Sequence, residues 1–188
     1  MKSAFTRLAL LGIVFSTSIY AQQENGLEPA WDIRKTLLEI SAYAGRLLPI
    51  LDQIEPQTWV EKGAPDTYVA QLNSSKVQAK ALAETAKELS KDPERLSAEL
   101  ETLFRIHSLD NMLASLENGI RKYQNPAVAE LLAGVAAEDG ASRVRLQNYI
   151  VELAADKEEQ LKIMDHEAQR CRGILTRQDT TPAKTGRK

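Results

Sequence analysis

Apolar residues recur at alternating steps of four and three along residues 33–54, and this spacing constrains the fold more than any other feature of the sequence. Residues three and four apart share one face of an α-helix, so the pattern predicts an amphipathic helix that must pack against other helices. Pro49 lies inside it, and we expect a kink there, with the helix ending at Pro56. The stripe consists of Ile33, Leu37, Ile40, Ala44, Leu47, Leu51 and Ile54.

A second helix is predicted after Pro65 and Asp66, which suit a first helical turn. Residues 57–64, with Trp59 and Gly63, are expected to form a loop before it. The short connection at residues 90–93 predicts that the second and third helices are antiparallel neighbours. The second stripe consists of Tyr68, Leu72, Ser75, Ala79, Leu82, Ala86 and Leu89.

The third helix is expected to run to about Tyr123, with apolar residues on two faces. We interpret this pattern as burial on two sides rather than a bend. One face has Leu96, Leu100, Leu103, Phe104 and His107; the other has Ile106, Leu109, Leu113, Leu116 and Ile120.

Two arrangements are open for residues 126–172. In the first, a short helix at 127–137 buries Val128, Leu131, Leu132 and Val135, and a break at 138–140 precedes a long helix from Ala141 to Leu175. In the second, one helix runs unbroken from Pro126 to Arg172. Lys157 fills the single gap in the inward stripe of the long helix, which consists of Leu146, Ile150, Leu153, Leu161, Met164, Ala168, Cys171 and Leu175.

These segments predict an all-α fold: antiparallel up-down helices with heptad stripes, resembling a four-helix bundle, plus a short extra helix. Residues 1–21 have the three parts of a secretory signal peptide: a positive start, an apolar core and a small-residue end before Gln22. We expect 22–29 to be a leader, 30–175 the helical bundle domain, and 176–188 a disordered basic tail. No later stretch is long and apolar enough to be a transmembrane segment.

Composition limits the classes of function. Aromatic residues make up 5% of the chain, and helix formers abound. The formal net charge is −2, and removal of Lys2 and Arg7 with the signal peptide would change it to −4. This balance argues against nucleic acid as a partner.

Cys171 is the only cysteine, so no disulfide can form within the chain. Its place on the apolar stripe predicts a buried, inert thiol; the alternatives are an exposed free thiol and an intermolecular disulfide. Trp59 lies on no stripe. We expect it to fold back and plug the end of the bundle, and the alternative is a contact with a protein partner.

Helical bundles can hold haem through His or Met, so His107, Met112 and Met164 are weak candidates for cofactor binding. His107 is more simply a residue at the core edge. His166 lies about 200° round the helix from Met164, on the charged face, and no metal-ligand spacing is present. We therefore expect no cofactor and no metal site.

The sequence motifs of phosphate loops, nucleophile elbows and EF-hands are absent, so we expect a chain that is not an enzyme. The leading hypothesis is an exported, periplasmic or secreted helical bundle that acts as a non-catalytic structural or interaction module, with a protein partner or self-association. The alternatives are a bundle that binds haem or metal, and a thiol-linked dimer through Cys171.

Overall fold

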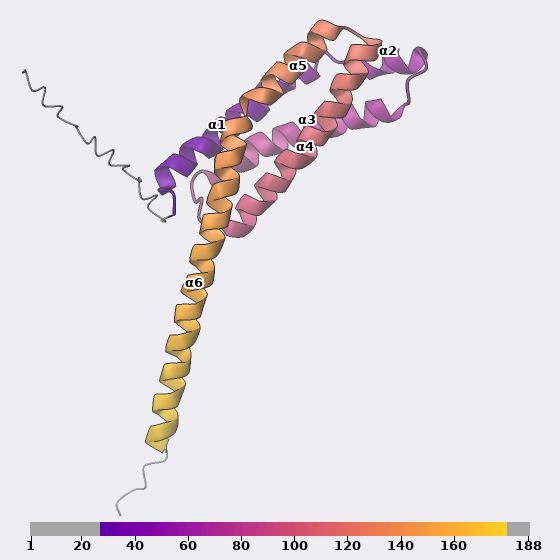
Figure 1. Ribbon diagram of the computed structural model, residues 1–188. Helices are drawn as coiled ribbons and strands as arrows, with labels where there is room; N and C mark the ends of the chain where they lie inside the picture. Colours follow the sequence, from indigo (N-terminus) through magenta and orange to yellow (C-terminus); the bar gives the residue numbers. More distant parts are fainter. Residues whose placement is uncertain (1–26, 180–188) are drawn as a thin grey trace, which may run out of the picture.

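The computed structural model describes residues 27–179, and within this range the chain folds into helices joined by short connections (Figure 1). The predicted all-α, bundle-like fold is confirmed. The helices are α1 (Ala30–Leu51), α2 (Pro56–Glu61), α3 (Thr67–Leu89), α4 (Leu96–Tyr123), α5 (Pro126–Glu138) and α6 (Gly140–Asp179).

Three long helices and one pair of helices form the bundle. α1, α3 and α4 run up and down beside one another, and both α5 and α6 contact α1 and α4. The fourth position is therefore occupied by α5 together with the first part of α6. The rest of α6 leaves the bundle and projects away from it (Figure 1).

The stripes of α1 and α3 lie in the core, as predicted. The seven apolar stripe residues beginning with Ile33 are between 0% and 4% exposed, and Pro49 lies inside α1 without ending it. α1 nevertheless ends at Leu51, earlier than the predicted end at Pro56. On α3 the six positions from Leu72 to Leu89 are buried, and Tyr68 is half-buried.

The prediction that α4 is buried on two faces holds only in part: on the second face Leu103 is buried and Leu96 and Leu100 pack against the core. Ile106, Leu109 and the later residues of that face are buried, whereas Phe104 is 65% exposed and His107 is exposed. The helices that pack against α4, namely α3, α5 and α6, therefore leave part of the second set of apolar residues in solvent.

Residues 56–61 form the short helix α2, which the prediction of a loop at 57–64 missed. Pro56 occupies its first turn, where a missing N–H costs nothing. Gly63 has a φ of 88°, a conformation that glycine adopts readily and that allows the chain to turn toward α3.

Of the two arrangements left open for residues 126–172, the structure has the one with two helices, and the break consists of Asp139 between α5 and α6. The side chain of Asn125 caps α5 by accepting a hydrogen bond from the backbone N–H of Ala127 at 2.9 Å. Ala129 and Leu132 are buried, but Leu131 is 49% exposed and does not point inward as predicted.

The predicted terminal segments fall largely outside the described residues. This applies to the signal peptide at 1–21, to most of the leader and to residues 180–188. The predicted tail from 176 is wrong in one respect, because α6 stays helical to Asp179. None of the helices in residues 27–179 combines the length and hydropathy of a membrane span.

Candidate interaction surface on α6

The two parts of α6 have different surroundings. Leu146, Tyr149, Ile150 and Leu153 are buried against the bundle. Beyond them, the ion pair of Lys157 with Glu94 at 3.9 Å joins α6 to the chain between α3 and α4. Every side chain at 158–175 is exposed. We call residues 158–175 the projecting half of α6.

The projecting half carries the second part of the predicted stripe in full contact with solvent. The prediction that these residues face the core was therefore wrong, although their spacing is as described. Leu161, Met164 and Leu175 are 63%, 66% and 61% exposed. We define the α6 stripe as Leu161, Met164, Ala168, Cys171 and Leu175.

Cys171 is a free, exposed thiol, so the prediction of a buried thiol was wrong for the same reason. The sequence shows only that Cys171 shares a face with apolar neighbours. Whether that face is covered depends on how far the bundle extends along α6. The other helices lie beside the first part of α6 only and do not reach its C-terminal part (Figure 1).

Local side-chain pairs support the projecting half. Gln160 donates to Asp156 at 2.7 Å, Gln169 donates to Asp165 at 2.8 Å, and Lys162 lies 3.4 Å from Glu159. Pairs of this kind stabilise a helix by about 0.2–0.5 kcal/mol each. An amphipathic helix gains most of its stability from packing, and the described residues of the bundle do not bury any side chain of the projecting half.

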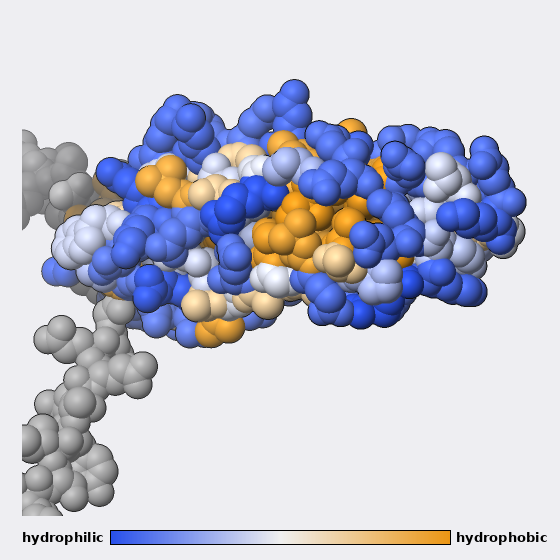
Figure 2. All heavy atoms as spheres, turned by 90° about the horizontal axis from the view of Figure 1, so that it is seen from above, coloured by the Kyte–Doolittle hydropathy of each residue, from blue (hydrophilic) through white to orange (hydrophobic). Residues whose placement is uncertain are grey.

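Apolar side chains also reach the bundle surface, but not as a stripe. Figure 2 shows an area of them in the view from above, ringed by hydrophilic residues. Within the described range, α1 to α5 each expose at most two large apolar residues. The projecting half exposes five: Leu161, Ile163, Met164, Ile174 and Leu175.

The structure does not bring the cofactor candidates together. His107 is exposed on α4, Met112 is half-buried on the same helix, and Met164 is exposed on the projecting half. His166 is also exposed there. Among residues 27–179, no group of three or more His, Cys, Asp or Glu side chains is placed to hold a metal ion.

Trp59 lies in α2 and is completely buried, in agreement with its interpretation as an end plug. Its ring packs against Tyr68 and Tyr123 with centroids 5.5 and 6.3 Å apart, and its indole N–H donates to Gln124 at 3.2 Å. The indole has no exposed surface to offer a partner. Gln124, which sequence reasoning missed, also donates to the carbonyl of Gln53 at 2.8 Å.

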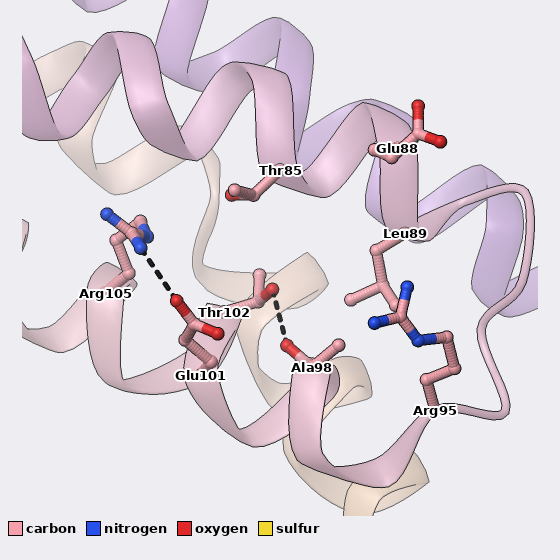
Figure 3. Close-up of a pocket in the computed structure, with 8 residues that line it drawn as sticks. All are labelled: Thr85, Glu88, Leu89, Arg95, Ala98, Glu101, Thr102 and Arg105. Carbon is pink, nitrogen blue, oxygen red and sulfur yellow. Dashed lines mark hydrogen bonds and ion pairs between the residues drawn. The ribbon is translucent and has the colours of Figure 1, made fainter.

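A pocket of about 170 Å³ lies between α3 and α4 (Figure 3). Its polar groups bond to one another: Arg105 donates to Glu101 at 3.0 Å, and Thr102 donates to the carbonyl of Ala98 at 2.8 Å. Pockets that enclose small ligands usually measure about 300–1,000 Å³. The pocket is therefore a poor candidate for a small-molecule site.

A cluster of one buried and two partly buried ionisable groups is a further feature that the sequence did not reveal. Arg143 contacts Asp110 and lies 3.6 Å from Asp139, and all three charges act on the buried hydroxyl of Tyr43. Burial raises the pKa of Asp139 to about 6 and also raises that of Asp110, although Arg143 acts in the opposite direction. This cluster joins α4 to the α5–α6 junction, so its evident role is structural.

Comparison with models of protein families, with curated proteins and with solved structures finds no match for this chain. The exposed stripe of the projecting half is the feature of residues 27–179 that points to a function.

Proposed function

We propose that this chain is a non-catalytic structural or protein-interaction module that works in the cell envelope after export, and that the projecting half of α6 is its contact element. One observation carries the proposal: a regular apolar stripe on a helix whose described side chains from 158 to 175 are all exposed. Contiguous exposed apolar surface of this kind marks protein or membrane contacts. The heptad-like spacing favours a helix as the partner.

The location rests on the sequence. Residues 1–21 have the pattern of a secretory signal peptide, and the proposal expects a mature chain that begins at Gln22. Mass spectrometry of the native protein from fractionated cells measures its N-terminus and its compartment. A chain that retains Met1 in the cytoplasmic fraction would contradict export.

The contact element is tested by photo-crosslinking in the native host. A benzoylphenylalanine is placed at Leu161 on the stripe, and in a control chain at His166 on the opposite face; both positions are exposed. The expected result is a protein adduct from position 161 and none from position 166. Equal adduct formation at the two positions, or none at either, would contradict the assignment of the stripe as the contact surface.

A further inference from the structure

We infer that the partner of the α6 stripe is the α6 stripe of a second copy of this chain, paired antiparallel. This inference rests on the proposed function and specifies its partner. The stripe advances by steps of three, four, three and four residues from Leu161 to Leu175, which is the spacing of a two-stranded coiled coil. A pair related by a twofold axis would use the same surface on both chains.

The position of the bundle determines the direction of pairing. At 100° per residue, the α6 stripe lies on nearly the same face of α6 as Leu146, Ile150 and Leu153, which are buried against the bundle. In a parallel pair the first part of the second α6 would run along this face, where the bundle already lies. An antiparallel pair places the two bundles at opposite ends and avoids the overlap.

Charge determines the register. One antiparallel register packs Cys171 of each chain against Ala168 of the other, and Met164 against Leu175. Flanking positions then meet their equivalents, which places Asp165 of each chain opposite Arg172 of the other. Opposite charges at these flanking positions are a main determinant of partner and orientation in coiled coils.

The neighbouring antiparallel register is less favourable. Shifting the chains by one heptad, so that Leu161 packs against Cys171, would place Asp165 opposite Asp165 and Glu167 opposite Glu167. Like charges at flanking positions oppose association. The preferred register also places the small side chains of Ala168 and Cys171 at the centre, where they allow the helices to approach closely.

Sedimentation of the full mature chain tests the pairing. The wild type is expected to dimerise, and Met164→Glu is expected to weaken the dimer at least about tenfold, because it buries a charge at a core position. Ile163→Glu is the matched control, since Ile163 is 56% exposed on the same turn but lies about 120° from the stripe centre. A wild-type chain that stays monomeric, or equal effects of the two variants, would overturn the inference.

Charge reversal tests the register. Asp165→Arg and Arg172→Asp should each weaken the dimer because each places like charges opposite one another, and the double variant should recover it. The far-UV circular dichroism of each variant checks that α6 stays helical. If the double variant instead dimerises more weakly than either single variant, the result would contradict the proposed Asp165–Arg172 contact.

Disulfide trapping distinguishes antiparallel from parallel pairing. One chain is the wild type, with Cys171 alone; the other is the tagged double variant Ala168→Cys with Cys171→Ala. In a mixture with oxidised glutathione, the two thiols lose two protons and two electrons to the glutathione disulfide, which leaves as two thiols. The expected product joins Cys171 of the wild type to the tagged chain. Predominant formation of the two homodimers would overturn the antiparallel register.

The photo-crosslink at Leu161 separates this inference from the proposed function. An adduct with a second copy supports both. An adduct with a different protein alone leaves the proposed function in place and overturns self-pairing, and an absence of adducts overturns both. Leu161 is the suitable position, since it lies at the end of the stripe and leaves the central contacts unchanged.

Discussion

At the scale of single residues, a buried carboxyl and a glycine each affect stability in a way that the sequence does not reveal. Glu99 is 0% exposed on α4, and neither carboxyl oxygen has a hydrogen-bond partner within the described structure. In the sequence it stands among the exposed carboxylates typical of an amphipathic helix. Only the position of the neighbouring helices shows that it lies inside.

Burial raises the pKa of Glu99 to about 8 from an ordinary value of 4.5. The folded chain therefore holds this proton at pH values where the unfolded chain releases it, so stability falls as the pH rises from about 4.5 to about 8 and then levels off. Glu99→Gln imitates the protonated form and removes this loss. We expect the variant to be about 1–3 kcal/mol more stable than the wild type at pH 8.

Urea unfolding at pH 4 and at pH 8 measures this effect. Near pH 4 Glu99 is largely protonated in both the folded and the unfolded wild type. Wild type and variant should therefore have similar free energies of unfolding at this pH. An equal difference at the two pH values would show that the carboxyl is not titrating in the folded core.

Gly119 allows α4 to approach the aromatic cluster around Trp59. A Cβ at this position would lie 2.8 Å from the Trp59 ring and 2.9 Å from the Tyr68 ring. Gly119→Ala should therefore destabilise the fold by about 1–3 kcal/mol through overpacking, despite the better helix propensity of alanine. Thermal unfolding measures the change.

Gly134→Ala on α5 is the matched control, because a Cβ there meets nothing within 4 Å. It should stabilise the chain by about 0.5–1 kcal/mol through helix propensity alone. If both substitutions stabilise the chain, the contact between α4 and the aromatic cluster is looser than described.

At the scale of elements, helix type and periodicity are well predicted, whereas the extent of coverage is not. The stripes of α1 and α3 are regular and lie against each other, so period and burial coincide. On α6 the same period continues from Leu146 to Leu175, but burial ends at Leu153. The spacing of apolar residues shows which face of a helix is apolar. The lengths of the neighbouring helices determine how much of that face is covered, and these lengths cannot be predicted from one stripe.

The projecting half should open more easily than the first part of α6, because it has few contacts beyond its own helix. In hydrogen exchange, amides of residues 158–175 should exchange faster than those of residues 142–156 in dilute protein. Raising the protein concentration should slow exchange in the projecting half if the stripe pairs with a second copy. Slow exchange at every concentration would contradict an unsupported helix.

At the scale of the whole molecule, the fourth position of the bundle depends on the junction between α5 and α6. Sequence reasoning located the break at 138–140 but counted the short helix as an addition to the bundle. α5 instead contacts both α4 and α1. A contact between residues distant in the sequence supports this arrangement, since Arg143, which lies near Asp139 at the junction, also contacts Asp110 on α4.

Arg143→Leu would leave the carboxyls of Asp110 and Asp139 without their cation. We expect a loss of about 2–3 kcal/mol at pH 7.5, less than for a fully buried pair because the Arg143 side chain is partly exposed. The pKa of Asp139 is raised to about 6, so at pH 4 this carboxyl is protonated and the loss should be smaller. Urea unfolding at both pH values measures it.

The continuity of α6 from the bundle into solvent has a geometric consequence. A helix rises 1.5 Å per residue, so in the proposed pair the two bundles would be separated by about 37 Å between their Lys157 residues. The shared rod would act as a spacer whose length is encoded by the number of residues in α6. Whatever each bundle is attached to would then be held at a fixed separation.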